Sequence, residues 1–163
     1  MQLNTNEYNP ELHDKYRALT VKQPYAQHLV TAAYVDDGIT YAEKSIEVRS
    51  RATSYRGDLL ICSSATPVMP GLLSGVTMGF VELDDVKPLE QFTEQDWANT
   101  CIPVDERPKK GFGWLMRNPR RVVEMPCKGQ LGIYYFVTPK DDITEYPTMC
   151  KVDKESWLLI QRK

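Results

Sequence analysis

The sequence predicts a mainly β fold of the α+β class: a small mixed β-barrel with a few short flanking helices. Short apolar runs recur along the chain, separated by glycine and proline turn signals. This spacing is typical of a barrel rather than of a parallel sheet. Only two segments have helical patterns, around residues 24–36 and, after a capping sequence, 93–97. With 163 residues and 42% hydrophobic content, the chain is large enough for one domain with its own core.

The predicted elements follow from local patterns. A first strand over residues 17–22 alternates apolar and polar side chains, and a helix with an apolar stripe runs from Pro24 to the stop at Asp36-Asp37-Gly38. Leu59–Cys62 is apolar on both faces, which is typical of a strand buried in a barrel wall. Gly79 lies inside its strand and indicates a bulge or a close backbone approach. The remaining predicted strands cover residues 43–50, 76–83, 112–116 (ended by Asn118-Pro119), 122–125 and 132–137.

Three regions of the chain differ in character. Residues 1–16 are a polar lead-in that we expect to be poorly structured or to lie on the surface. Residues 17–138 contain the predicted strands and form the domain. Residues 139–163 are an extension, and its apolar run at Trp157–Ile160 fits an edge strand, a helix or a contact with a second chain.

Composition argues against several classes of protein. A net charge of −2 does not suit a protein that simply coats polyanions. No apolar run is long enough to cross a bilayer, and the start of the chain lacks a signal-peptide core. The four cysteines are far apart and there are only two histidines, so we expect no metal site, and we expect no cofactor either. Isolated cysteines fit reduced thiols in a cytoplasmic protein, and no particular oligomeric state is predicted.

Charge is distributed unevenly along the chain. Residues 82–106 carry eight acidic side chains and one lysine, a net charge of −7, whereas residues 107–128 carry seven basic side chains and one glutamate, a net charge of +6. Such a swing gives either one acidic and one basic face or two segments of opposite sign that attract each other.

In the segment Glu43–Ser50, charged side chains of both signs are combined with the alternation of apolar residues that is typical of a strand. In a strand, Ile46 faces one way and Glu47 and Arg49 the other, where their side chains are close enough to pair. Lys44 falls on the Ile46 side, and we expect its stem to lie on apolar surface while its amine reaches solvent or a ligand. A structural ion pair with a surface lysine is the plain alternative to a binding site.

Several motifs, in order along the chain, resemble those of the ASCH domain family: Leu19-Thr20-Val21-Lys22-Gln23-Pro24-Tyr25-Ala26, Lys44-x-x-Glu47-x-Arg49-Ser50, Arg56-Gly57-Asp58-Leu59-Leu60-Ile61, Phe112–Pro119 and Pro126–Gly132. The resemblance covers roughly residues 17–138 and implies a PUA-like β-barrel. There are two departures. Ala42 stands where the family's Gly-x-Lys-x-x-Glu-x-Arg signature begins with glycine, and residues 30–41 lengthen the connection into the signature strand.

The main functional hypothesis is binding of RNA or a modified nucleotide in a cleft beside the Lys44–Arg49 strand. Lys44 and Arg49 offer donors and positive charge to a phosphate or a base carbonyl, and Glu47 can accept from an amino or imino group. Tyr25 and Trp114 are candidates to stack a base, although core packing explains Trp114 better.

Two alternatives stay open. The resemblance also implies a small amidohydrolase acting on N-acylated pyrimidine nucleosides, in which Lys44 matches the family's catalytic lysine. Glu47 then stands where those enzymes have threonine, so their hydroxyl is missing. The second alternative is a protein-interaction module without catalysis, with residues 30–41 and the extension as contact surfaces.

The candidate residues divide into two sets. Lys44 and Glu47 are catalytic only if the protein is an enzyme. The candidate ligand-binding or RNA-binding residues, of which those in 107–128 would contact phosphates, are Gln23, Tyr25, Lys44, Glu47, Arg49, Ser63, Ser64, Trp114, Arg117, Arg120, Arg121 and Lys128.

Overall fold

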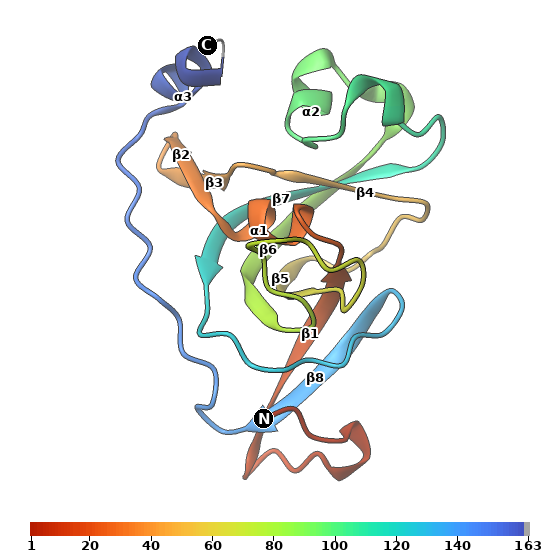
Figure 1. Ribbon diagram of the computed structural model, residues 1–163, viewed down its shortest axis with the longest axis vertical. Helices are drawn as coiled ribbons and strands as arrows, with labels where there is room; N and C mark the ends of the chain where they lie inside the picture. The colour runs from red at the N-terminus through yellow and green to blue at the C-terminus, as the bar shows by residue number, and fades with distance from the viewer. Residues whose placement is uncertain (162–163) are drawn as a thin grey trace.

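The computed structural model describes residues 1–161 and contains a strongly curled six-stranded sheet with short helices around it (Figure 1). The strand order is β4–β7–β6–β5–β1–β8. The strands are β1 (His13–Val21), β4 (Ile46–Arg49), β5 (Gly57–Ser63), β6 (Thr77–Pro88), β7 (Phe112–Arg121) and β8 (Ile133–Pro139). The first and last strands of this order, β4 and β8, are the two edges of the sheet. β1 and β5 are parallel and the other neighbouring pairs are antiparallel, so the sheet is mixed. The predicted mainly β, barrel-like fold is confirmed.

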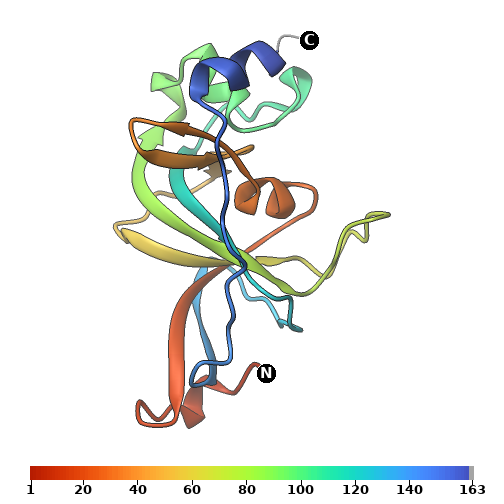
Figure 2. The same cartoon turned by 90° about the vertical axis from the view of Figure 1, so that its left-hand side faces the viewer.

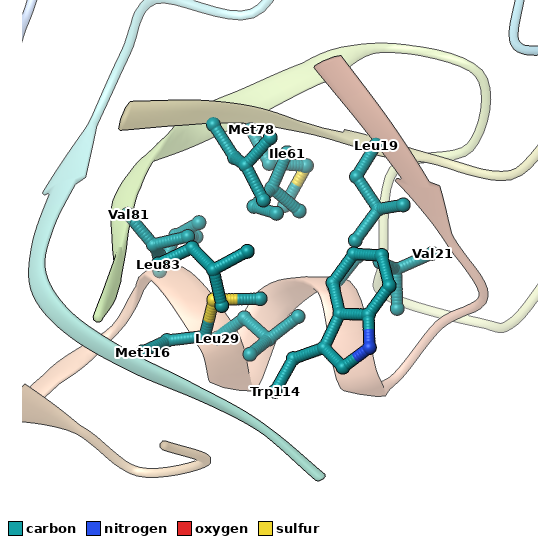
Figure 3. Packing of buried hydrophobic residues seen from close by; sticks show 12 residues of the cluster. Leu19, Val21, Leu29, Ile61, Met78, Val81, Leu83, Trp114 and Met116 are labelled. Atoms are coloured by element: carbon teal, nitrogen blue, oxygen red, sulfur yellow. The ribbon is translucent and has the colours of Figure 1, made fainter. Parts of the chain in front are cut away.

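The core lies inside the curl, where α1 (Tyr25–Val30) packs against the sheet. Figure 3 shows Leu29 of α1 surrounded by apolar side chains from β1, β5, β6 and β7. Leu59–Cys62 of β5 is fully buried, as expected for a strand covered on both faces. A Cβ atom at Gly79 would lie 2.6 Å from the carbonyl oxygen of Arg120 and 3.0 Å from Val30, so the predicted close backbone approach at this glycine is confirmed.

The helix predicted over residues 24–36 was wrong beyond Val30. Residues after it form a hairpin of β2 (Ala32–Asp36) and β3 (Ile39–Ala42). Asp37 and Gly38 have φ values of 50° and 77°, the left-handed conformation that a two-residue hairpin turn requires and that Asp-Gly adopts readily. The turn signal and the flanking β-formers therefore outweigh the short apolar stripe. This hairpin is the lengthened connection before the signature strand.

Both ends of the chain pack on the barrel. β1 begins at His13, earlier than predicted, because its first residues pair with β8 as far as Pro139. The 3-10 turn η1 (Thr5–Glu7) precedes it. The extension after β8 crosses the outside of the molecule and ends in α3 (Lys154–Gln161), beside the hairpin (Figure 2). There the ring of Trp157 stacks on Tyr34 at 6.2 Å, so a helix is the observed form of the apolar run.

The middle of the chain holds the smaller elements. The predicted capped helix is α2 (Glu94–Ala98), where Thr93 and Asp96 form a capping box. Two 3-10 turns flank it, η2 (Leu89–Gln91) and η3 (Val104–Glu106). The predicted end of β7 at Asn118-Pro119 was wrong, because the strand continues to Arg121 through a register shift, with Asn118 at a φ of 53°. The strand predicted at 122–125 is reduced to one isolated bridge, between Val122 and Glu145.

Candidate functional site

A pocket of about 460 Å³ opens between the edge strand β4, the end of β1 and the turn at Gln130-Leu131-Gly132 that precedes β8. Lys44, Glu47 and Arg49 all line it. The three charges singled out from the sequence thus surround one concavity. Among the other lining residues are Thr20, Lys22, Tyr25, Ser64, Ile102 and Leu131.

Glu47 is the centre of the charged group. Its Oε2 atom accepts a hydrogen bond from Nε of Arg49 at 3.1 Å and forms an ion pair with Nη2 of the same side chain at 2.9 Å. Its Oε1 atom lies 3.4 Å from Nζ of Lys44. Only 10% of the Glu47 side chain is exposed, so two cations neutralise a nearly buried carboxylate, as a buried charge requires.

Lys44 lies deeper than the sequence indicated. Only 1% of the residue is exposed, its Nζ atom donates to the carbonyl oxygen of Thr100 at 2.5 Å, and the ring of Tyr25 is centred 4.8 Å away. The expectation that its amine reaches solvent is therefore wrong. Burial lowers the pKa of Lys44, and the negative charge of Glu47 opposes that shift.

A local backbone constraint explains the position of Lys44. The amides of Ser45 and Ile46 both donate to the carbonyl oxygen of Asn99, at 3.0 Å and 3.2 Å. The chain before β4 is therefore tied to the segment after α2 and is not an extended strand. Since the two-residue alternation does not reach back to Lys44, its side chain turns to the Glu47 side.

Arg49 joins the two walls of the pocket. Its Nη2 atom donates to the carbonyl oxygen of Thr20 in β1 at 2.9 Å, and 28% of its side chain is exposed. Within residues 1–161 its remaining terminal nitrogen, Nη1, has no hydrogen-bond partner. The arginine is therefore held in place and keeps donors for a ligand.

Two further pockets adjoin the first and share lining residues with it. One, of about 1130 Å³, shares Thr20, Ser64 and the turn at Gln130-Leu131. The other, of about 600 Å³, shares Arg49, Ser50 and Leu131-Gly132. We call these three pockets together the seam furrow, since they follow the gap between the sheet edges. Leu131 is fully exposed at the point where all three meet.

The seam furrow is basic although the protein is acidic overall. Its lining includes five basic residues, namely Lys22, Lys44, Arg49, Arg51 and Lys128, and one acidic residue, Glu47. With five basic side chains against one acidic one, the lining has an excess of positive charge even after Glu47 is neutralised. Such a concave surface attracts anions.

Three of the remaining candidates make structural contacts. Gln23 is buried, donates to the carbonyl oxygen of Leu73 and accepts from the amide of Gln27, each at 2.9 Å. The hydroxyl of Ser63 accepts from the amide of Val76 at 3.2 Å. Trp114 is 5% exposed, points into the core in Figure 3 and donates from Nε1 to the carbonyl oxygen of Arg51 at 3.0 Å. It also lines the 600 Å³ pocket, so its ring forms part of the furrow wall.

The arginines of β7 lie elsewhere and are paired. Arg117 contacts Glu82 and Asp84, Arg120 lies 2.7 Å from Asp58, and Arg121 lies 3.4 Å from Glu124. The pockets that Arg120 and Arg121 line share no residue with the seam furrow. Attraction between the two segments of the charge swing, the second of the two interpretations, is seen where Arg117 pairs with Glu82 and Asp84 of β6 and where Arg107 pairs with Glu94. None of the three β7 arginines is brought to the furrow.

Some contributors were not found from the sequence. Thr100 accepts from Lys44 through its backbone, which leaves no pattern in the side chains. Arg51 and the turn at Gln130-Leu131 line the furrow, but neither stands in a local motif that points to a ligand.

Residues 1–161 show neither a cluster of metal ligands nor a membrane-spanning helix. That part of the chain holds no group of three or more His, Cys, Asp or Glu side chains arranged to bind a metal ion. It also contains no helix with the length and apolar character needed to span a membrane.

Comparison with known proteins gives one clear match. The model of the ASCH domain matches residues 19–141, which include the end of β1, α1, the signature strand and β8. No curated protein matches the chain significantly. Since the matched region is most of the sequence and contains the whole curled sheet from Leu19 on, the chain belongs to the ASCH domain family.

Proposed function

We propose that the protein binds a nucleotide of RNA in the seam furrow, beside β4. The observation that carries the proposal is the Lys44–Glu47–Arg49 group, which lines a pocket with surplus positive charge in a protein of net charge −2. A pocket of about 460 Å³ is within the usual range for a small ligand. Membership of the ASCH family supports the same class of ligand, because the PUA-like fold suggests RNA binding.

The chemistry of the pocket fits a nucleotide in two ways. Arg49 supplies unpaired N–H groups for a phosphate or a base carbonyl. Each carboxylate oxygen of Glu47 retains a lone pair that can accept from a base amino or imino group. The ring of Tyr25 lies at the same pocket and offers an apolar face to a base.

We base the proposal on binding rather than on hydrolysis because of Lys44. An amidohydrolase would need this amine as a base or nucleophile facing its substrate. Here the ammonium donates to Thr100 and contacts Glu47, and the residue is almost wholly covered. A partner protein is a weaker candidate for the same furrow, since the cores of protein interfaces are depleted in charged residues and this lining carries six of them.

The test compares two arginine variants. Fluorescence anisotropy with a labelled single-stranded RNA at low salt measures affinity for the wild type, Arg49→Met and Arg120→Met. Arg120 is the matched control, because it is an arginine of similar exposure that is paired with Asp58 outside the furrow. A charged hydrogen bond contributes about 1.5–3 kcal/mol, so Arg49→Met should weaken binding by about tenfold or more. Equal affinities for the two variants, or no binding by the wild type, would contradict the proposal.

A further inference from the structure

Cations and tyrosines alternate in a row along the outer part of β1 and β8. Nζ of Lys15 lies 4.4 Å from the ring centre of Tyr8 and 4.6 Å from that of Tyr135. The guanidinium carbon of Arg17 lies 4.6 Å from the same Tyr135 ring and 5.1 Å from that of Tyr55. The order is therefore Tyr8, Lys15, Tyr135, Arg17, Tyr55, which we call the cation–tyrosine ladder.

The strand register connects this ladder to the seam furrow. Lys15, Arg17 and Leu19 are alternate residues of β1 and share one face. In β8, Tyr135 pairs with Arg17 and Ile133 pairs with Leu19. Since Leu19 and Ile133 both line the furrow, the ladder begins one residue pair beyond its wall. From Lys15 to Leu19 β1 advances about 13 Å at the ordinary strand rise.

The contacts of the ladder leave its cations available to a ligand. A cation–π contact uses the charge of a lysine or arginine but none of its N–H donors. Lys15 and Arg17 are both exposed, and 39% of Tyr135 is exposed between them. Arg120 shows the contrast: it also lies over a ring, that of Phe80 at 5.4 Å, but its Nη2 donates to Asp58 and its Nε to the carbonyl oxygen of Asn118.

We propose that the cation–tyrosine ladder is a second binding surface, which holds the phosphates and one base of a single-stranded nucleic acid as the chain leaves the seam furrow. The inference rests on the proposed function and extends its ligand from one nucleotide to several. Lys15 and Arg17 bind phosphates, and a base packs against the exposed edge of the Tyr135 ring, which lies between the two cations. Basic grooves combined with aromatic side chains are the ordinary means of holding single strands.

The experiment separates the ladder from the furrow by ligand length. Affinities are measured for uridine monophosphate and for oligo(U) and oligo(dT) of two, four and eight nucleotides, which also shows whether ribose is needed. The proteins are the wild type, Lys15→Ala/Arg17→Ala, Tyr135→Ala, Tyr135→Phe and, as the control, Arg120→Ala. Thermal unfolding of each variant confirms that the fold is intact.

The ladder predicts a specific pattern. Affinity of the wild type should rise with length, and the double variant should lose about tenfold for eight nucleotides while binding uridine monophosphate normally. Its log–log salt dependence should become shallower by about 1.4, which is about 0.7 for each of the two phosphates that the variant no longer neutralises. Tyr135→Ala should weaken binding of the long strand by about fivefold or more, and Tyr135→Phe should restore it, because the ring and not the hydroxyl contacts the base and holds the two cations.

Other results have distinct meanings. If affinity does not rise with length, or if the double variant binds eight nucleotides as tightly as Arg120→Ala does, the ladder inference is overturned while the furrow proposal stands. Full displacement of the oligonucleotide by an equally charged acidic peptide also overturns it, since bases would then contribute nothing. If the wild type binds neither mononucleotide nor oligonucleotide, the proposed function itself fails.

Discussion

Nη2 of Arg49 lies 2.9 Å from the carbonyl oxygen of Thr20, and this hydrogen bond joins the edge strand β4 to the end of β1, where β1 extends past its pairing with β8. β4 and β1 are not neighbours in the sheet, because β7, β6 and β5 lie between them. The same side chain therefore closes the curl and lines the pocket. Binding chemistry and the shape of the barrel depend on one residue.

Replacing Lys44 with methionine should destabilise the fold. The substitution keeps most of the volume but removes the ammonium that Thr100 and Glu47 contact. We expect the free energy of unfolding to fall by about 2–3 kcal/mol. Removing the only partner of a buried charge would cost more, but Arg49 still neutralises Glu47 in this variant. Urea unfolding measures it. The double variant Lys44→Met/Glu47→Gln should cost less than the sum of the single changes. Strict additivity would show that the two side chains are not coupled.

The lowered pKa of Lys44 also predicts a pH effect. Between this lowered pKa and the usual lysine value near 10.4, the unfolded chain binds more protons than the folded protein. The free energy of unfolding of the wild type should therefore rise with pH through this window, relative to that of Lys44→Met. Unfolding titrations of both proteins at several alkaline pH values give the difference. A difference that is constant with pH would mean that Lys44 keeps its ordinary pKa.

Gly113 is predicted to tolerate no side chain. A Cβ atom there would lie 2.2 Å from Phe92 and 2.8 Å from Ile46, inside the pairing of β7 with β4. Gly113→Ala should lower the free energy of unfolding by about 1–3 kcal/mol through overpacking. Gly38→Ala serves as the comparison, because a Cβ atom at Gly38 would meet no neighbouring atom, although the residue has a φ of 77°. This substitution should cost only the strain of a left-handed residue, about 1–2 kcal/mol. Only Gly113→Ala should also disturb β4, visible as shifted amide resonances of Ile46–Arg49.

Much of this architecture was predictable because its patterns are local. The alternation in β1, the double-faced burial of β5 and the capping box at Thr93 each lie within a few residues of sequence. The hairpin was missed because Ala32 and Ala33 extend an apolar stripe that α1 does begin, and the decisive Asp37-Gly38 turn follows later.

The site was predictable only in part. Lys44, Glu47 and Arg49 were found because they lie within six positions of one another. Their arrangement was not, because Asn99 and Thr100, far along the chain, determine where Lys44 points. The arginines of β7 show the opposite case. A charge run suggested a basic face, whereas Arg117 lies opposite Glu82 in the β6–β7 register, Arg120 pairs with Asp58 of β5, and Arg121 pairs with Glu124.

Cys127 is predicted to be the most reactive thiol. It lines the 1130 Å³ pocket, and contact with the Cys62 thiol, helped by the Tyr134 hydroxyl at 3.4 Å, lowers the pKa of Cys127 to about 7. Burial raises the pKa of the Cys101 thiol, although that residue is the more exposed. Iodoacetamide at neutral pH should therefore label Cys127 before Cys101, with a rate that rises around pH 7. Peptide mass spectrometry measures both sites, with Cys127→Ser as the control. Faster labelling of Cys101 would show that exposure, not thiolate content, decides reactivity.

The most direct test of the central claim follows the three tryptophan indole N–H signals in an NMR titration with single-stranded RNA. The Trp114 indole donates to Arg51 in the furrow wall, whereas Trp157 lies on α3 against Tyr34 and Trp97 lies in α2 under Arg107. A nucleotide in the seam furrow should shift the Trp114 signal and the Arg49 Nε–H signal while those of Trp157 and Trp97 stay in place. Unchanged Trp114 and Arg49 signals at saturating RNA, or shifts confined to the arginines of β7, would contradict binding in the furrow.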